Sequence, residues 1–466
     1  MASLIETHIQ GKPHLTKLSL NRVHCSACSK TIKVSFSAVK SCIISHEKSR
    51  LHTQNYARWS REPMRQMAIN GQQTGGQDNF AERLAELLVS CNIPWIKINR
   101  PTFKRFVHDF CGRGCPDEST LRKFYLKPMY QKSIESIRRE LANEWIYLQV
   151  DEAVLSSRRV VSVLVGALNG EQPTSYCLNI VELESAANNT LIQQTISNSL
   201  AILWPEGIKY DRVRLLITDQ ASYMTLASSM MKQSLYPKLL HVTCLCHALH
   251  RVCEDVRRSF PAADRLINDF KIVFARSSRR VNLLQHHLGK PLPSFPVCTR
   301  WGTWIEFCLF LIDSYDQIKD CAASFKDEDC ASIQPLLEAL DSADTKLELS
   351  EIFKLRGLPA TIKSLEERGL SVIEQKELIE KEKERLPPRF RSKLEACLDK
   401  NPDIEKLFAI EDLASSIRFL FAPLVSVDVE RSFSQFKCII TDRRTGFTAE
   451  NFVNYAVVHF NSFLNQ

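Results

Sequence analysis

A short stretch near the middle of the chain, in which a buried strand runs into an acidic residue, most constrains what this sequence can fold into. Val213 and the run Leu215–Ile217 are apolar without alternation, which predicts a strand buried on both faces. Asp219 follows, and residues 220–232 have the pattern of a helix. Ligands and metals gather at the carboxyl ends of such strands, so Asp219 is a candidate metal ligand. Asp is also a favoured N-cap residue, and a structural role as a helix cap stays open.

Other strand-like and helix-like segments surround this stretch in a regular order. Three strands are expected in succession, then a helix, and then two strands that are each followed by a helix. The strands are expected at 146–151, 160–167, 175–181, 213–217 and 239–243, and the helices at 189–203, 220–232 and 246–256. Consecutive strands can form an antiparallel meander, and strands joined through helices add in parallel. The order therefore predicts an α/β fold with a mixed sheet.

A second acid, Asp151, is expected to end the first of these strands as Asp219 ends the fourth. In a mixed sheet of this order the two strands can be neighbours, which would bring the two carboxylates together. Carboxylates a few Å apart repel unless a cation lies between them. Mg²⁺ is bound by one or two carboxylates together with phosphate oxygens, so it is the expected ion. Glu152 should point to the opposite face if the strand continues through it.

Towards the N-terminus, after a leader expected over residues 1–20, four potential metal ligands follow one another in the order C-x2-C, 17 residues, H-x5-H: Cys25, Cys28, His46 and His52. Two thiolates and two imidazoles at this spacing are typical of tetrahedral zinc. A helix is expected over 41–51, and three basic residues lie along it or beside it: Lys40, Lys48 and Arg50. A small metal-held module with a basic helix commonly enters a DNA groove. Two surface thiols and two incidental histidines are the alternative.

The excess of basic over acidic residues lies wholly in the first third of the chain. Residues 1–143 contain 23 Lys and Arg against 11 Asp and Glu, whereas the remaining residues contain 38 against 42. This asymmetry indicates a polyanion partner such as nucleic acid, or else only a solvated basic face. The 16 cysteines are scattered, which favours a reducing compartment. Neither a membrane span nor a signal peptide is expected.

Helical patterns occupy most of the remaining sequence. After a polar linker over 60–78, helices are expected from Phe80 to Cys91, over 101–111 and from 117 to 142. The apolar faces of these three helices, which in the second helix include Phe103, Phe106, Val107 and Phe110, predict a small helical core rather than a ligand site. Residues 305–420 are also helical in pattern, and the charged part at 366–391 is typical of a solvated helix.

Several motifs carry a resemblance to a known family. Asp219 with its flanking residues 218–224 resembles the second-acid motif of hAT-superfamily transposases. Three further motifs resemble theirs in the same order: Cys244-x-x-His247, Arg300-Trp301, and Glu430-Arg-Ser-Phe-Ser followed by a helix ending at Asn461. Residues 22–130 are similar to the CGG triplet repeat-binding protein family, itself similar to hAT-derived sequences. The likeness rests there on the Cys-x-x-Cys finger, Cys91-Asn-Ile-Pro94 and Leu121–Leu126.

The resemblance implies a ribonuclease-H-like core in which Asp151, Asp219 and Glu430 hold two Mg²⁺ or Mn²⁺ ions and catalyse DNA strand cleavage and joining. It places Cys244 and His247 near that site. It also implies that Arg300 contacts DNA and that a base extruded from the DNA stacks on Trp301. Double-stranded DNA is the implied partner, the nucleus the implied location, and a homodimer or higher homo-oligomer the implied assembly.

Together these observations predict a domain order. The expected parts are a leader at 1–20, a BED-like C2H2 zinc finger at 21–59, a linker at 60–78, a helical DNA-binding or oligomerisation segment at 79–143, the first part of the core at 144–304, a helical insertion at 305–420, and core completion with a dimerisation segment at 421–466. A DNA transposase, or a protein derived from one, is the main hypothesis. The rivals are a non-catalytic, sequence-specific transcriptional regulator and a protein-interaction module that uses residues 433–463.

Several of these residues have a purely structural alternative. The segment from Cys244 to Cys253 could hold a second zinc, but a packed helix is the simpler interpretation. Trp301 and Trp304 could simply be core aromatic residues, and for Trp304 that is the expected role. Glu430 could be a surface acid paired with Arg431.

Overall fold

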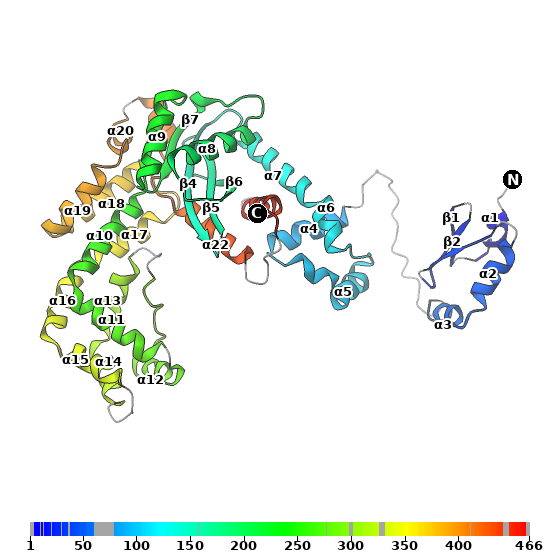
Figure 1. Cartoon of the computed structure of the whole chain (residues 1–466), viewed down its shortest axis with the longest axis horizontal. Coiled ribbons are helices and arrows are strands. Elements are labelled where there is room, and N and C mark those ends of the chain that lie inside the picture. The colour runs from blue at the N-terminus through cyan, green and yellow to red at the C-terminus, as the bar shows by residue number, and fades with distance from the viewer. Residues whose placement is uncertain are drawn as a thin grey trace. The chain divides into compact units, whose positions relative to one another are not determined.

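The computed structural model describes residues 4–9, 11–12, 14–19, 21–28, 30–35, 38–59, 79–156, 158–275, 277–297, 302–325, 331–410, 412–440 and 447–462. The chain divides into two compact units, Met1–Gln77 and Asp78–Gln466 (Figure 1). Within the described ranges, no helix is both long enough and apolar enough to cross a membrane.

The smaller unit is a three-stranded antiparallel sheet with three helices. Its elements are α1 (Leu4–Ile9), β1 (Leu15–Ser19), β2 (Arg22–Cys25), β3 (Lys30–Lys33), α2 (Val39–Glu47) and α3 (Arg50–Trp59). The expectation of a leader over residues 1–20 is wrong. Ile5 and Leu15 are buried, and Leu15 pairs with Cys25, so this segment supplies part of the unit's own core.

The single helix expected over 41–51 is two helices. Helix α2 ends at Glu47, and α3 begins at Arg50. The Ser49 hydroxyl accepts a hydrogen bond from the His52 backbone N–H at 3.2 Å, which is the N-cap pattern of a new helix. The break matters because it allows His46 and His52 to approach the cysteines from different helices.

The larger unit is built on a five-stranded mixed sheet, which confirms the predicted α/β class. Its strands are β4 (Trp145–Leu155), β5 (Arg158–Leu168), β6 (Tyr176–Leu183), β7 (Val213–Thr218) and β8 (Leu240–Thr243), in the order β6-β5-β4-β7-β8. Strands β4, β5 and β6 form an antiparallel meander, and β7 and β8 run parallel to β4. Strand β7 is buried at five of its six positions, as its unbroken apolar run predicts.

The first strand does not end at Asp151. Strand β4 continues to Leu155 because β5 pairs with it along its whole length, with Asp151 opposite Ser162. The parallel pairing with β7 stops earlier, at Gln149 and Ile217. Asp151 therefore lies where one neighbouring strand has ended and the other continues.

Helices precede the sheet in the sequence, connect some of its strands and follow its last strand. Before the sheet come α4 (Phe80–Ser90), the 3-10 helix η1 (Trp95–Asn99), α5 (Pro101–Cys111), α6 (Glu118–Phe124) and α7 (Leu126–Glu140). Leu84, Leu88 and Trp95 belong to one apolar core with the sheet. The segment 79–143 is thus part of the larger unit. The predicted helical core is also wrong in composition, because Val107 is buried whereas Phe106 and Phe110 are 61% and 77% exposed.

Within and after the sheet the helices are α8 (Asn189–Leu203), η2 (Tyr210–Arg212), α9 (Ser222–Ser234), α10 (Leu245–Ser259), α11 (Pro261–Phe274), α12 (Ser278–Leu288), α13 (Thr303–Asp313), α14 (Tyr315–Ala323), α15 (Ile333–Asp341), α16 (Ala343–Phe353), α17 (Gly357–Leu365), α18 (Val372–Arg385), α19 (Pro388–Leu398), α20 (Ile404–Phe408), α21 (Leu413–Phe419), α22 (Val427–Ile439) and α23 (Ala449–Ser462). Helices α11 to α16 extend away from the sheet in Figure 1. In α22 and α23, Phe433, Phe436, Phe452 and Phe460 are buried in the core that contains the sheet, so the apolar side chains of the expected dimerisation segment pack inside the chain.

A buried asparagine side chain closes each edge of this sheet. Asn401 accepts a hydrogen bond from Thr243 N–H at 3.0 Å and donates one to Thr243 C=O at 2.8 Å. On the opposite edge, Asn461 makes the same pair of bonds to Cys177, at 2.8 and 2.9 Å. Each amide therefore takes the place of a neighbouring strand. Asn401 also ties the segment after α19 to β8, immediately before Cys244.

Candidate metal and active sites

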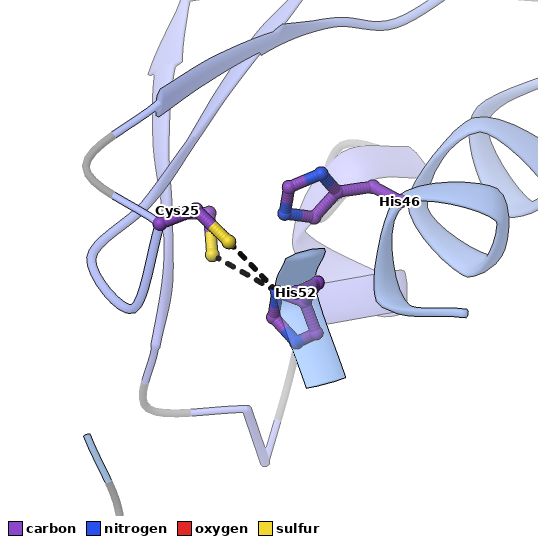
Figure 2. A group of neighbouring side chains, drawn as sticks. Cys25, His46 and His52 are labelled. Carbon is purple, nitrogen blue, oxygen red and sulfur yellow. Dashed lines mark hydrogen bonds between the residues drawn. The ribbon is translucent and has the colours of Figure 1, made fainter. Parts of the chain in front are cut away.

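The four predicted zinc ligands converge in the smaller unit. The ligand atoms of Cys25, Cys28, His46 and His52 all lie within 4.8 Å of one another. Cys25 ends β2, Cys28 follows in the turn, His46 lies in the last turn of α2, and His52 lies in the first turn of α3. The labelled side chains of Cys25, His46 and His52 point toward one another in Figure 2.

The distances within this cluster suit a tetrahedral zinc ion. Zn–S and Zn–N bonds of about 2.3 and 2.0 Å at a tetrahedral angle place sulfur and nitrogen about 3.5 Å apart. The His52 Nδ1 atom lies 3.5 Å from Cys25 Sγ and 3.3 Å from Cys28 Sγ. The His46 Nε2 atom is buried and has no hydrogen-bond partner among the described residues. Burial lowers the pKa of His46, which keeps the ring in the neutral form that binds metal. The cluster can hold a metal such as zinc.

His14, which is not one of the four predicted ligands, lies beside His52 of this cluster. Its ring centroid is 5.2 Å from that of His52, and its Nε2 lies 3.4 Å from a carboxylate oxygen of Glu47. Nothing in the sequence singled out His14, because residues 1–20 were expected to be a leader. The three predicted DNA-contacting residues of this unit, Lys40, Lys48 and Arg50, are all exposed.

A second cluster forms in the larger unit from residues far apart in the sequence. Ligand atoms of Asp151, His247 and Glu430 lie within 4.8 Å of one another. They come from the middle of β4, the first turn of α10 and the first turn of α22. The His247 Nε2 atom is 3.8 Å from Glu430 Oε1. Glu430 is therefore not paired with Arg431, whose guanidinium binds Asp428 instead.

Backbone contacts between two distant segments hold this cluster together. Leu245 N–H donates to Leu424 C=O at 3.0 Å, and Ser426 N–H donates to the sulfur of Cys244 at 3.2 Å. Helix α22 begins at the next residue, so its first turn comes to lie beside the first turn of α10. Cys244 itself continues the ladder of β8 by donating its N–H to Thr218 C=O at 2.9 Å. The Cys244-x-x-His247 motif thus fixes the helix that delivers Glu430.

The electrostatics of the cluster are those of acids brought close together, with Asp151 buried. Burial raises the pKa of Asp151 well above its usual range, and the neighbouring Glu430 carboxylate raises it further. Burial also raises the pKa of Glu430. Burial lowers the pKa of His247, but Cys244 and the two carboxylates outweigh it and raise the value to about 9. A divalent cation at this position would remove the repulsion that these shifts express.

Asp219 lies next to the cluster and outside it. Asp219 follows the last residue of β7, and its charge contributes to the raised pKa of Asp151. The interpretation of Asp219 as the cap of α9 is wrong. The N-cap position is Ala221, and Asp219 Oδ1 accepts a hydrogen bond from Ala221 N–H at 3.1 Å in the turn before the helix.

Tyr223 and Glu152 extend the acidic surroundings of Asp219. The Tyr223 hydroxyl donates to Glu152 Oε2 at 3.1 Å. Burial raises the pKa of Tyr223, and the charges of Asp219, Glu152 and Asp151 add to this. Glu152 was expected to point to the opposite face of the sheet from Asp151. Its side chain is nevertheless linked through Tyr223 to the surroundings of Asp219. The sequence offered no signal for this link.

The remaining predicted site residues fall into three groups. Arg300 and Trp301 lie outside the described residues. Trp304 is buried and donates its ring N–H to Asp264 at 2.8 Å, which confirms that it is a core residue. The cysteines at 246 and 253 are buried in α10 and are not part of a metal-ligand cluster within the described ranges, so the packed-helix interpretation of this segment holds.

A cavity of about 440 Å³, lined by residues that include Glu306, Glu366 and Glu430, opens beside the cluster.

Comparison with known proteins adds no assignment. A scan against models of protein families gave no match, and a search of curated proteins found no similar sequence.

Proposed function

We propose that this protein is a DNA transposase of the hAT type, or derives from one, and that its larger unit is a ribonuclease-H-like core performing metal-dependent phosphoryl transfer. The observation that carries the proposal is the approach of Asp151 and Glu430, from β4 and α22, with the charge of Asp219 acting on Asp151. The strand order β6-β5-β4-β7-β8 also supports it, because a three-strand meander followed by two parallel strands is the order expected for that fold.

Three carboxylates brought close together can supply what phosphoryl transfer needs. Two divalent ions bound there would activate a water or a 3′-hydroxyl and stabilise the leaving oxygen. Asp151 is close to Glu430 and is affected by the charge of Asp219, so it is the candidate to contact both ions. The ligand atoms of Asp151, His247 and Glu430 fit within 4.8 Å, whereas opposite ligands of one octahedral Mg²⁺ are about 4.2 Å apart, so a small closure suffices.

Cleavage and strand joining by the full chain test the proposal. With Mn²⁺ or Mg²⁺, the protein should nick supercoiled plasmid and join a labelled 3′-hydroxyl oligonucleotide to it. Asp219→Ala should lower both rates about 100-fold or more, because metal stabilisation is worth several kcal/mol and each 1.4 kcal/mol is tenfold. Glu450→Gln, at an exposed acid of α23, is the matched control. Cleavage without metal, or unchanged in Asp219→Ala, would refute the proposal.

The smaller unit supports a second candidate, a DNA-binding regulator that does not cleave. Its observation is the metal-ligand cluster with exposed Lys40, Lys48 and Arg50 on the adjoining helices and the turn between them. This candidate predicts sequence-selective, salt-sensitive binding to double-stranded DNA, lost on Cys25→Ser, with no nicking under any metal. Binding and nicking measured on one preparation separate the two candidates.

A further inference from the structure

We infer that His247 Nε2 is itself a metal ligand, and that with Asp151 and Glu430 it forms a site that selects a transition-metal ion such as Mn²⁺ over Mg²⁺. The inference deepens the proposed function by naming the ion, but metal binding can be tested without DNA. The inferred site differs from a site of three carboxylates. The residue whose ligand atom lies within 4.8 Å of those of Asp151 and Glu430 is His247 rather than Asp219.

The placement of the ring favours coordination. The Nε2 atom faces the carboxylates at 3.8 Å from Glu430 Oε1, a separation that falls between adjacent and opposite ligands of one ion, about 3.0 and 4.2 Å. The side chain of His247 is 22% exposed, so an ion can reach it from the open side on which Glu430 is 41% exposed.

The other side of the ring is held as metal-binding histidines are usually held. Such histidines donate their second ring N–H to a neighbouring acceptor, which fixes the tautomer and the ring orientation. Here Nδ1 lies 3.4 Å from Ser426 Oγ, and the ring also forms a hydrogen bond with the Cys244 side chain. Nε2 faces Glu430, which leaves Nδ1 for these two partners. Cys244 is therefore a positioning residue for His247.

The donor set decides which ion the site prefers. Mg²⁺ takes oxygen ligands almost exclusively, whereas imidazole nitrogen suits first-row transition metals. Two carboxylates with one imidazole should therefore bind Mn²⁺ more tightly than Mg²⁺. Asp219, which lies outside the cluster, is left to contact a second ion together with Asp151.

The neighbouring histidine of the same helix supplies a control. His250 lies one turn further along α10, with its Nε2 3.7 Å from Glu254 and away from the two acids. It resembles His247 in residue type, helix and an acidic partner, but it is not part of the metal-ligand cluster. His250→Gln should therefore behave as wild type.

The experiment measures Mn²⁺ bound to the full chain, with the finger loaded with zinc so that His46 and His52 are occupied. Electron spin-echo spectroscopy of bound Mn²⁺ should show coupling to a ¹⁴N nucleus in the wild type and in His250→Gln, and none in His247→Gln. His247→Gln should weaken Mn²⁺ binding about tenfold or more and change Mg²⁺ binding little. Cys244→Ala should weaken Mn²⁺ binding about tenfold while ¹⁴N coupling persists.

Two outcomes would overturn the inference, and neither of them can result from the misfolding of a variant. One is Mn²⁺ bound to the wild-type chain without ¹⁴N coupling, and the other is coupling that persists in a folded His247→Gln. Metal-dependent nicking by a chain whose Mn²⁺ has no nitrogen ligand would remove this inference and leave the proposed function. Nitrogen-bound Mn²⁺ on a chain that cuts no DNA would remove the proposed function and leave this inference.

Discussion

The asparagine that closes the edge of β8 gives the sharpest quantitative prediction. In Asn401→Ala, Thr243 loses the partner of both its N–H and its C=O, and both residues are buried. Each hydrogen bond contributes about 1 kcal/mol net, and each buried group left unpaired costs about 1–3 kcal/mol. Because partial access of water will relieve one of the two groups, we expect the free energy of unfolding to fall by about 3 kcal/mol.

The second asparagine provides an internal comparison. Asn461→Ala removes the same two bonds at Cys177 on the other edge strand and should cost a similar amount. Four strand spacings of about 4.8 Å separate the edges, roughly 19 Å, so the two losses should add to within about 0.5 kcal/mol. Asn143→Ala, at an exposed turn before β4, should change stability by less than about 0.5 kcal/mol.

Urea unfolding of the full chain measures these values, and amide hydrogen exchange locates them. Exchange should accelerate in the peptide containing Thr243 for Asn401→Ala and in the peptide containing Cys177 for Asn461→Ala. A loss below about 1 kcal/mol in both variants, or faster exchange elsewhere only, would refute the idea that these amides replace a neighbouring strand.

Three further predictions concern the metal, the pH dependence and the packing. Cys25→Ser should abolish zinc binding, measured as metal per chain by mass spectrometry, whereas Cys42→Ser, outside the cluster, should retain it. Burial lowers the pKa of His241 from 6.5 to about 4, so the unfolded chain binds the extra proton between these values. About 3 kcal/mol of stability is therefore present above pH 6.5 and lost as pH falls toward 4, a slope that His241→Gln should lack in thermal melts. Gly166→Ala would place Cβ 2.3 Å from the buried tyrosine ring of β4 and should cost about 2–3 kcal/mol, whereas Gly114→Ala meets nothing within 4 Å and should be neutral in the same melts.

Local patterns predicted the elements whose limits are set by local chemistry. Helix α8 has the expected bounds because the Asn188 side chain caps its first turn. Helix α5 has them because Pro101 begins it and Gly112, in a left-handed conformation, ends it. The break before α3 was missed because Ser49 is an ordinary residue until its hydroxyl is seen to cap a helix.

Long-range contacts could not be predicted in the same way. No periodicity near Leu245 or Leu424 indicates that their backbones bond, yet this contact brings Glu430 to His247. The extension of β4 past Asp151 likewise depends on β5, which pairs with every residue of it. The metal-ligand spacing in the smaller unit was predictable because its four residues lie within one short segment. Only the resemblance suggested the approach of Asp151 and Glu430.

The position of Glu430 and Asn461 late in the chain has a consequence for synthesis. A ribosome adds about 5–20 residues per second, so β4 is exposed for several seconds or more before α22 can supply Glu430. During that interval the chain has no complete acidic site, and nascent or truncated forms ending before residue 427 should not cleave DNA. The edge of β6 stays open until Asn461 emerges, and an open edge pairs readily with other chains. Loss of α23 should therefore show first as aggregation during translation.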